Sequence, residues 1–365
     1  MKYDFLIVGA GLFGSVFAQQ CKENNKKVLV IDKRDHIAGN CYTENKNGIN
    51  IHKYGPHIFH TNNDTVWNYV NRFTKFNSFI NRPKVFYDNK IYSFPINLFT
   101  LNQIWGITNP EQAKYKLKSV AIEADDIDNL ESWALSQVGE EIYNIFIRGY
   151  TKKQWGKEPK DLPSSIIKRL PIRLDFNDNY FKDQYQGIPI DGYTNMVVNM
   201  LDGIDVILNE DYLDRRDYWD SKANQIVYTG PIDKFFEYVN GNLEYRSLLF
   251  QSEFLPINDY QGNAIINFTE ESIPYTRIIE HKHFDWKDNI KGTVITKEYP
   301  LGYNKRSEPY YPVNDTHNQN IYNRYYHLTK ESPKYIFGGR LAEYKYYDMH
   351  QVIASALSKF TKYGI

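Results

Sequence analysis

Three glycines near the N-terminus have the spacing of a turn that holds a dinucleotide. Gly9, Gly11 and Gly14 form a G-x-G-x-x-G pattern, which directly follows the apolar run of residues 3–8 and opens a helical pattern. In such a turn the first glycine permits the tight bend, the second lets the backbone approach a pyrophosphate, and the third lets the helix pack closely on the strand. The phosphates would then lie at a helix N-terminus, where unpaired N–H groups and the helix dipole favour anions.

An acidic residue and two further turns extend this pattern. Asp32 follows the second apolar run, 18 residues after the last of the three glycines, and its carboxylate can accept hydrogen bonds from ribose hydroxyls. Ala38-Gly39-Asn40 and Gly338-Gly339-Arg340 contain small residues that allow close approach to a cofactor, and Asp348 precedes a helical pattern. Flavoproteins of the glutathione-reductase-like superfamily bind one FAD with both ends of the chain. Because only one convincing dinucleotide fingerprint is present, we predict FAD rather than NAD.

The composition excludes several classes of protein. The 44 basic and 44 acidic residues balance, so no long-range field would recruit nucleic acid. The longest apolar stretches are shorter than the roughly 20 residues of a membrane span, and the N-terminus enters a strand too early for a signal peptide. Cys21 and Cys41 fit no common zinc motif and no disulfide framework. We therefore expect a cytoplasmic enzyme that neither binds nucleic acid nor inserts into a membrane, with some of its 31 tyrosines lining a polar ligand site.

Hydrophobic periodicity predicts an α/β protein with inserted segments. Strand-like runs alternate with helical patterns at both ends of the chain, whereas residues 99–148 are helical and residues 245–300 contain alternating segments typical of an antiparallel sheet. A hairpin is predicted around Asp88-Asn89 and a helix start at Asn109-Pro110. The predicted domains are a Rossmann-like FAD domain (1–77, 192–240 and 314–365), a helical domain (99–163) and a sheet domain on the substrate side (78–98, 164–191 and 241–313).

A set of motifs along nearly the whole chain resembles the prokaryotic UDP-galactopyranose mutases. The motifs are HKYGPHIFHT (52–61), GYTKKQWG (149–156), KRLPIR (168–173), NYFKDQYQGIPIDGYT (179–194), YTGPID (228–233), PYTRIIEHKHF (274–284), KEYP (297–300), EPYYP (308–312) and FGGRLAEYKYYDM (337–349). The resemblance implies an α/β flavoprotein whose Rossmann-like FAD domain carries an inserted helical bundle and an antiparallel six-stranded sheet. It also implies a homodimer.

The same resemblance implies an isomerase that interconverts UDP-galactopyranose and UDP-galactofuranose without net redox change. The expected chemistry belongs mostly to the cofactor. N5 of reduced FAD would form an adduct with the galactose while UDP leaves, and a separate electron donor would keep the FAD reduced. No protein nucleophile is needed, and no nucleophile-elbow or cysteine motif is found in the sequence.

Binding a diphosphate in a neutral protein requires local cations, and arginine suits phosphate because its planar fork stays charged. By resemblance, Arg169 and Arg277 bind the diphosphate, and Arg340 lies close to both flavin and sugar. The implied aromatic and polar contacts of the nucleotide sugar are Asn81, Phe146, Tyr150, Trp155, Tyr180, Tyr311 and Tyr346. The residues expected at the FAD are Gly9, Gly11, Leu12, Phe13, Gly14, Asp32, Lys33, Gly39, Asn40, His57, His60, Gly339, Arg340, Tyr346, Asp348 and Met349.

Two histidines, His57 and His60, would suggest a metal or an acid–base pair in isolation. Their spacing is loop-like and no carboxylate recurs nearby, so we expect no metal site. By resemblance, the His60 segment lies near flavin N5, and the catalytic set comprises His60, Arg169, Arg277 and Arg340. Arg246 and Glu298 would lie near the flavin or sugar, or form an ordinary ion pair in the sheet.

The segment of residues 164–187 is expected to close over the substrate, because it is irregular and contains Arg169. Three other functions stay open at this point. The enzyme could act on UDP-N-acetylgalactosamine, it could be a flavin-dependent oxidase or dehydrogenase, or it could bind nucleotide sugars without catalysis.

Overall fold

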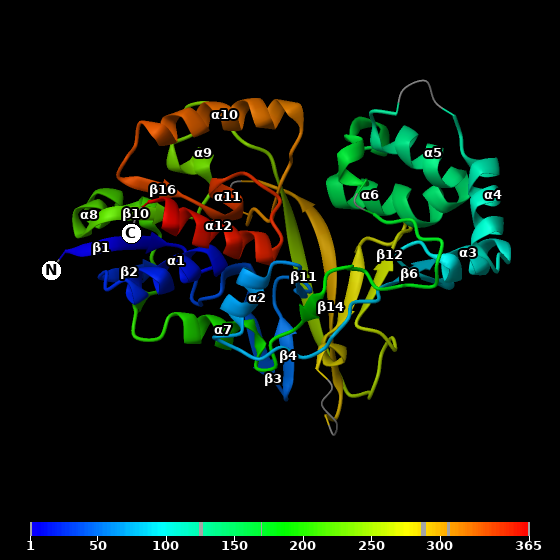
Figure 1. Cartoon of the computed structure of the whole chain (residues 1–365), viewed down its shortest axis with the longest axis horizontal. Coiled ribbons are helices and arrows are strands. Elements are labelled where there is room, and N and C mark those ends of the chain that lie inside the picture. The colour runs from blue at the N-terminus through cyan, green and yellow to red at the C-terminus, as the bar shows by residue number, and fades with distance from the viewer. Residues whose placement is uncertain (1, 124–126, 169, 286–289, 305–306, 364–365) are drawn as a thin grey trace.

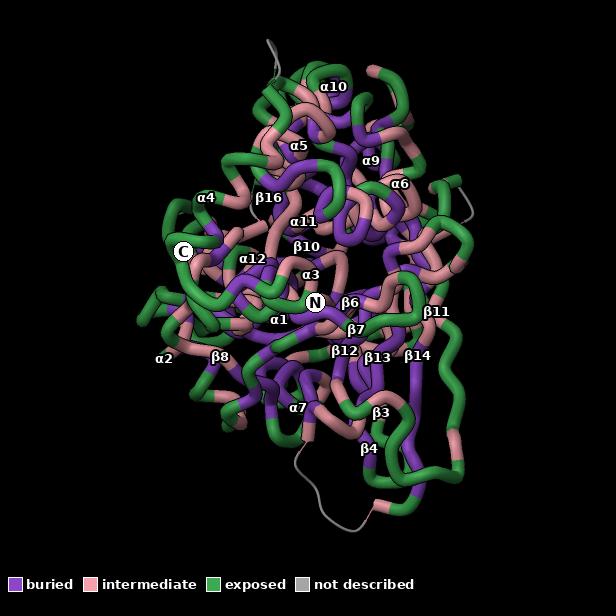
Figure 2. The backbone as a smooth tube through the Cα atoms, turned by 90° about the vertical axis from the view of Figure 1, so that its right-hand side faces the viewer, coloured by how far each residue is buried: buried purple, intermediate pink, exposed green. Residues whose placement is uncertain are grey.

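The computed structural model describes residues 2–123, 127–168, 170–285, 290–304 and 307–363, which form two lobes joined by a mixed sheet (Figure 1). The Rossmann lobe is built on a parallel sheet, and the helical lobe lies on the other side of the mixed sheet. Buried residues follow the inner strands of both sheets, such as β1 (Tyr3–Val8), β2 (Val28–Ile31) and β13 (Arg277–Glu280) (Figure 2). By contrast, β9 (Asp205–Ile207), much of β11 (Tyr245–Leu255) and the outer helices and loops are largely exposed.

The parallel sheet has the strand order β16-β10-β1-β2-β9. These strands are Tyr335–Phe337, Ala223–Tyr228, Tyr3–Val8, Val28–Ile31 and Asp205–Ile207. Its inner strands read as continuous apolar runs because helices cover both faces, as is typical of parallel sheets. Alternate residues therefore enter different cores: Ile7 and Val30 pack on one face, whereas Leu6, Leu29 and Ile31 pack on the other.

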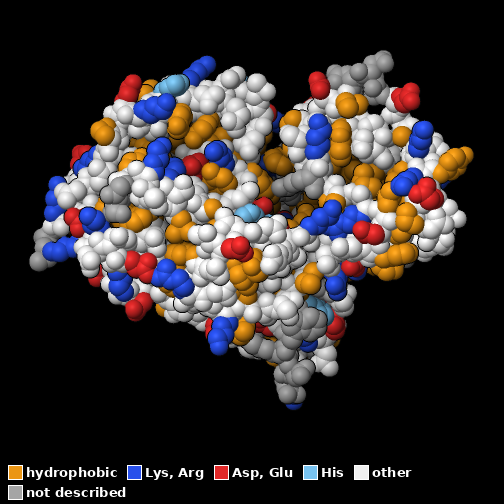
Figure 3. Space-filling model, viewed as in Figure 1, with side chains coloured by type: hydrophobic (Ala, Val, Ile, Leu, Met, Phe, Trp, Pro, Cys, Tyr) orange, Lys and Arg blue, Asp and Glu red, His pale blue; other side chains and the backbone are white. Residues whose placement is uncertain are grey.

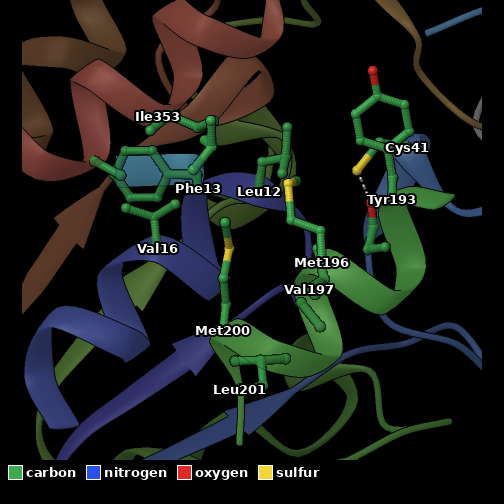
Figure 4. Close-up of a cluster of buried hydrophobic side chains, with 14 of the residues drawn as sticks. Leu12, Phe13, Val16, Cys41, Tyr193, Met196, Val197, Met200, Leu201 and Ile353 are labelled. Carbon is green, nitrogen blue, oxygen red and sulfur yellow. Dashed lines mark hydrogen bonds between the residues drawn. The ribbon is translucent and has the colours of Figure 1, made fainter. Parts of the chain in front are cut away.

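The two faces of the parallel sheet are covered by different helices. One face packs against α1 (Leu12–Glu23), α7 (Gly192–Met200) and α12 (Met349–Lys362). Figure 4 shows side chains of all three helices together in this core, including Phe13, Met196 and Ile353. The opposite face packs against α8 (Arg216–Lys222), α9 (Ile232–Phe235) and α10 (Thr316–Lys330). The predicted Rossmann-like class is confirmed.

The mixed sheet has the order β15-β11-β14-β13-β12-β6-β7 within the described residues. Its strands are Tyr311–Pro312, Tyr245–Leu255, Thr293–Gly302, Arg277–Glu280, Ile265–Phe268, Lys84–Tyr87 and Lys90–Ser93. It differs in detail from the expected antiparallel sheet of six strands, because it has seven strands and β12 pairs with β6 in parallel. The parallel pair arises because the β6–β7 hairpin comes from a separate part of the chain. Asp88 and Asn89 both have positive φ, as the two-residue turn of that hairpin requires.

The helical lobe begins with α3 (Leu98–Trp105), α4 (Pro110–Val120) and α5 (Leu130–Ile142). Asn97, Asn109 and Asn129 cap these helices with side-chain oxygens, and the predicted start at Asn109-Pro110 is confirmed. A π-helical segment, η2 (Tyr143–Arg148), then leads into α6 (Gly149–Trp155). Apolar residues along these elements form a core of their own.

The remaining elements are short and lie in both lobes and between them. There are two small antiparallel pairs in the described residues: β3 (Thr43–Lys46) with β4 (Ile49–His52), which lies against α7 and β14, and β5 (Phe59–Thr61) with β8 (Tyr185–Gly187), which lies against α12. The short helices are α2 (Asp64–Val70), α11 (Gly339–Ala342), η1 (Gly39–Cys41), η3 (Pro159–Asp161), η4 (Ser164–Ile166), η5 (Tyr212–Arg215) and η6 (His281–Phe284). Both cysteines are free and buried. Across the described parts of the chain, no helix combines the length and apolarity that a bilayer crossing needs.

Candidate active site

The N-terminal glycine turn has the geometry that its sequence predicts. Gly9 has a φ of 110°, and a Cβ there would lie 2.0 Å from the hydroxyl oxygen of Thr229. A Cβ on Gly14 would lie 1.9 Å from the carbonyl oxygen of Gly9, so the helix packs directly on the turn. A Cβ on Gly39 would lie 2.9 Å from Cα of Gly11. The two glycine turns therefore approach each other at a distance that side chains would prevent.

Helix α1 begins without a side-chain cap. Its N-cap is Gly11, which has no capping hydrogen bond, and its first turn contains no acidic residue. By contrast, Asn63, Asn97 and Asp315 cap other helices with side-chain oxygens. The N–H groups of the first turn of α1 are thus available to an anion, as at the phosphate sites of dinucleotide-binding folds.

Asp32 lies at the end of β2 with both carboxylate oxygens engaged by backbone. Oδ2 accepts a hydrogen bond from the N–H of Ala10 at 2.7 Å, and Oδ1 accepts one from the N–H of Arg34 at 2.9 Å. These bonds fix the carboxylate at the wall of a cavity, and each oxygen keeps a second lone pair for a hydroxyl donor.

The first cavity, of about 290 Å³, follows the two glycine turns. Predicted cofactor residues that line it are Gly9, Gly11, Leu12, Phe13, Gly14, Asp32, Lys33, Gly39, Asn40, His57, Gly339, Arg340 and Met349. One part of its wall comes from the loop between β14 and β15, because Glu308 pairs with Lys33 at 2.6 Å and with Arg34 at 3.3 Å. Burial opposes ionisation of Glu308, but the two cations lower its pKa below the ordinary value. Sequence reasoning missed Arg34 and Glu308, which are distant in the chain.

A second cavity, of about 420 Å³, lies where the helical lobe, the mixed sheet and the Rossmann lobe meet. Figure 3 shows the molecule hollowed between the two lobes. Predicted substrate residues that line this cavity are Asn81, Phe146, Tyr150, Tyr180, Arg277, Tyr311 and Tyr346. Four residues, Asn40, His57, Arg340 and Met349, line both cavities, so the two spaces adjoin.

Arg277 is held in the second cavity by a buried carboxylate. Its Nε and Nη2 donate to the two carboxylate oxygens of Glu298, each at 2.9 Å. The residues face each other across β13 and β14, and Glu298 is fully buried. Burial disfavours the charge on Arg277, but Glu298 outweighs this effect and raises the pKa of Arg277 above its ordinary value. Glu298 is therefore a sheet ion pair, and it orients the arginine that lines the cavity.

Arg246 does not join this pair. Its Nε donates to the carbonyl oxygen of Gln154 at 2.9 Å, and Nη2 donates to that of Lys153 at 3.4 Å. It lines neither of the two adjoining cavities. The sequence left two alternatives for Arg246 and Glu298: a place near the flavin or sugar, or an ordinary ion pair in the sheet. Glu298 does form an ion pair in the sheet, but its partner is Arg277 and not Arg246.

Tyrosines surround the cationic side of the second cavity. The rings of Tyr311 and Tyr346 stack with centroids 5.2 Å apart, and the guanidinium carbon of Arg340 lies 5.7 and 5.6 Å from their centroids. Burial raises the pKa of Tyr150 to about 12 and also raises that of Tyr311. These phenols are therefore protonated near neutral pH and can donate hydrogen bonds to an anion.

His60 has a carboxylate partner that the sequence analysis did not find. Its Nδ1 lies 2.6 Å from a carboxylate oxygen of Asp183, and its ring stacks on Phe181 with centroids 3.6 Å apart. The prediction that no carboxylate lies near this histidine is wrong. Pairing of β5 with β8 places His60 opposite Gln186 and brings Asp183 across 123 residues of chain. The only available signal was that Asp183 belongs to one of the recognised motifs.

His57 lies where the two cavities meet. Its Nδ1 is 2.8 Å from the carbonyl oxygen of Gly55. Burial is the main cause that lowers the pKa of His57 to about 4, with smaller contributions from Arg340 and Arg277. The ring is therefore neutral at physiological pH, and Nδ1 donates to the carbonyl while Nε2 is an acceptor.

Several predicted residues are not in the expected cavity. His60 and Asp348, which were expected at the cofactor, line the second cavity and not the first, whereas Tyr346, which was expected at both ligands, lines the second. Trp155, which was expected at the uridine, lines a third cavity of about 230 Å³ that also includes Tyr346. Arg169 lies outside the described residues, so its contact with the diphosphate stays a prediction.

The segment of residues 164–187 contributes to the second cavity through Pro171, Tyr180 and Phe181. It contains η4 and β8 and is otherwise without regular structure in its described part. The backbone N–H of Tyr180 donates to the carbonyl oxygen of Asn81 at 2.8 Å, which ties this side of the segment to the cavity wall. Closure of the segment over a substrate stays a prediction.

Comparisons with known proteins agree with this arrangement. The family model described as UDP-galactopyranose mutase matches residues 145–346, and the model of an NAD(P)-binding Rossmann-like domain matches residues 7–73. The chain is 40% identical to dTDP-fucopyranose mutase of Escherichia coli, with 96% of each chain covered. It is also 40% identical to a probable UDP-galactopyranose mutase of Klebsiella pneumoniae, over 97% of this chain and 93% of that one. The fold is similar to a crystal structure of reduced UDP-galactopyranose mutase, with a TM-score of 0.74, 14% identity, and coverage of 99% of this chain and 95% of that chain.

Proposed function

This chain belongs to the UDP-galactopyranose mutase family, and from that premise we propose that it interconverts UDP-galactopyranose and UDP-galactofuranose. FAD would bind along the first cavity and the nucleotide sugar in the second. The observation that carries this proposal is the junction of the two cavities, where Asn40, His57, Arg340 and Met349 line both spaces. A cofactor that extends from the glycine turns would reach the substrate at this junction.

The residues of the first cavity fit FAD. The uncapped first turn of α1 offers N–H groups to a pyrophosphate, and Asp32 offers carboxylate oxygens to ribose hydroxyls. The close approach of Gly11 and Gly39 leaves the backbone accessible where side chains would obstruct it. FAD, when bound and reduced, would supply an electron-rich nitrogen that can attack the anomeric carbon reversibly, so the protein need not provide a nucleophile.

The residues of the second cavity would hold the diphosphate while its bond to the sugar is broken. Arg277 is oriented by Glu298, and Tyr311 and Tyr346 stack beside Arg340. A guanidinium and protonated phenols can stabilise the negative charge that develops on the departing UDP, and they require no rearrangement to do so. Holding UDP close to the opened sugar would also favour its return.

Two histidines lie where the cofactor would meet the substrate: His57 lines both cavities, and His60 lines the second. His57 is neutral because burial lowers its pKa to about 4, so it adds no positive charge beside Arg340. Asp183 orients the ring of His60 in the second cavity by accepting a hydrogen bond from Nδ1, and Nε2 lies 3.9 Å from a carboxylate oxygen of Asp348. We place His60, Arg277 and Arg340 in the catalytic site, and Arg169 with them by family resemblance.

A second candidate substrate is dTDP-fucose, because the E. coli dTDP-fucopyranose mutase is as similar to this chain as the K. pneumoniae protein is. The two substrates differ in the nucleoside and in the sugar hydroxyl at C6, whereas the diphosphate and the ring rearrangement are common to both. UDP-N-acetylgalactosamine is the third sugar nucleotide worth testing.

The test compares all three sugar nucleotides with dithionite-reduced enzyme, and the ring forms are separated by chromatography. We expect the highest kcat/KM with UDP-galactose, many turnovers per reduced flavin and no turnover by oxidised enzyme. Higher kcat/KM with dTDP-fucose would assign the second candidate. Stoichiometric oxidation of the sugar would instead indicate a flavin-dependent oxidase or dehydrogenase.

We further propose a cytoplasmic homodimer that receives electrons from a separate donor. Free, buried Cys21 and Cys41 suit a reducing compartment. The dimer rests on family resemblance, and light scattering coupled to gel filtration of the FAD-loaded protein would test it.

A further inference from the structure

Lys153, in the motif GYTKKQWG, makes three hydrogen bonds to one turn of the mixed sheet. Its ammonium donates to the carbonyl oxygens of Phe268 at 2.7 Å, Ile273 at 2.9 Å and Tyr275 at 3.0 Å. Phe268 ends β12, and Ile273 and Tyr275 lie in the connection from β12 to β13. An ammonium has three N–H donors, so this contact uses them all.

The contact joins two elements that each supply a residue to the wall of the second cavity. Lys153 lies on α6, one turn after Tyr150, and Tyr275 lies two residues before Arg277 at the start of β13. Both Tyr150 and Arg277 line the cavity. The separation of these two side chains thus depends on how the helix is fixed to the turn.

Two further features show that α6 and this turn are in close contact. The hydroxyl of Thr269 donates at 2.6 Å to the carbonyl oxygen of Ile145, in the η2 segment that leads into α6. A Cβ on Gly149 would lie 2.2 Å from the carbonyl oxygen of Thr269, so the start of the helix packs directly on backbone. These contacts fix the first part of the helix, and Lys153 fixes the next turn.

The neighbouring lysine provides a comparison. Lys152 pairs with Glu158 at 2.8 Å and with Glu271 at 3.0 Å, and its side chain is 38% exposed. Exposed ion pairs of this kind contribute little because solvent screens them. The two adjacent lysines have the same charge and side-chain length, and they differ in how they contact the turn that leads to Arg277. Lys153 donates to three backbone carbonyls, whereas Lys152 reaches only the side chain of Glu271, which is itself partly exposed.

We propose that Lys153 is a positioning residue for the nucleotide diphosphate, which sets the separation of Tyr150 and Arg277 by fixing α6 to the β12–β13 turn. This inference rests on the proposed function of the second cavity. Lys153 does not line that cavity, so it acts on the ligand through the residues that do.

The test measures UDP binding by calorimetry on reduced, FAD-loaded enzyme. Lys153→Met should weaken UDP binding by about tenfold or more, because small displacements of binding groups have large effects. Lys152→Met is the matched control and should change the dissociation constant by less than about twofold. A Lys153→Met variant that binds UDP like the wild type, even with a lower unfolding temperature, would reduce Lys153 to a structural role and overturn the proposal.

The pH dependence gives a second measurement that does not rely on Lys153→Met folding. Burial lowers the pKa of Lys153 to about 8, while Glu270 and Glu271 oppose that change. Above this pH a neutral amine has only two N–H groups, so one carbonyl loses its donor. The wild type should therefore bind UDP more weakly at pH 9 than at pH 7. Lys153→Arg should lack this decline, because a guanidinium stays charged.

Equal pH profiles for the wild type and Lys153→Arg would overturn the positioning role. Failure of the wild-type enzyme to bind UDP at any pH would contradict the proposed function instead, and the two failures are therefore distinguishable.

Discussion

The two adjoining cavities are built in different ways. The first is formed largely by backbone: glycine turns, the open N-terminus of α1, and a carboxylate fixed by two backbone N–H groups. The second is formed by side chains from the helical lobe, the mixed sheet and the C-terminal region. A backbone site depends on the absence of side chains, so one added methyl group can destroy it. A side-chain site depends on the orientation of each group, so each substitution there weakens ligand binding by a part of its total.

The largest expected effect is at Gly14. A Gly14→Ala substitution places Cβ 1.9 Å from the carbonyl oxygen of Gly9, and backbone cannot move aside as a flexible side chain can. We expect a loss of at least about 3 kcal/mol in the free energy of unfolding and no retained FAD. Urea titration and flavin absorbance would measure both. Gly302→Ala is the control, since its Cβ would meet nothing within 4 Å. Retention of FAD by Gly14→Ala would contradict the backbone description of the first cavity.

An intermediate effect is expected at Arg277. Lysine at this position keeps the charge but cannot make the two parallel hydrogen bonds to Glu298, so its orientation in the cavity is lost. Arg277→Lys should weaken UDP binding by about tenfold to a hundredfold, with FAD content unchanged. Arg82→Lys, at an ion pair whose arginine side chain is 53% exposed, should change UDP binding by less than about twofold. Loss of FAD from Arg277→Lys would show that the two cavities are not separable in this way.

The last expected effect concerns stability alone and is the acid response of His57 at the junction. The pKa of His57 is lowered to about 4, whereas an unfolded histidine titrates near 6.5. Between these values the unfolded chain binds a proton that the native state does not. The stability present above pH 6.5 is therefore lost as the pH falls toward 4, at about 1.4 kcal/mol per pH unit for this histidine.

Between pH 6.5 and 4, the free energy of unfolding of a His57→Gln variant should fall by about 1.4 kcal/mol less per pH unit than that of the wild type. Urea titration at several pH values would measure both slopes. An unchanged slope would mean that His57 is protonated in the native state. The conclusion that His57 is neutral at the junction would then have to be abandoned.

The same contrast explains how well each cavity could be anticipated from the sequence. Residues of the first cavity lie in short motifs whose spacing has a direct backbone meaning, and Gly9, Gly14 and Asp32 are placed as the pattern predicts. Residues of the second cavity were inferred by family resemblance, and most line one space. Trp155 lines a neighbouring cavity with Pro163 and Pro312 instead, because five residues along α6 place it on a different face of the helix from Tyr150.

Pairs formed across long stretches of chain could not be anticipated. The partner of His60 is Asp183, brought close by the β5–β8 pair, and Glu308 closes the first cavity by pairing with Lys33. The parallel pairing of β12 with β6 is of the same kind. Local periodicity carries information about which residues face a core, but it carries none about which of several strands will be neighbours.

By itself the amino-acid sequence determined the glycine turns, the alternation of strands and helices, and the asparagine caps, because each depends on interactions within a few residues. Only the tertiary structure decided that two cavities adjoin, that Glu298 orients Arg277, and that Lys153 fixes α6 to the turn before β13. These features depend on distances between segments far apart in the chain, which are set by the packing of the whole molecule.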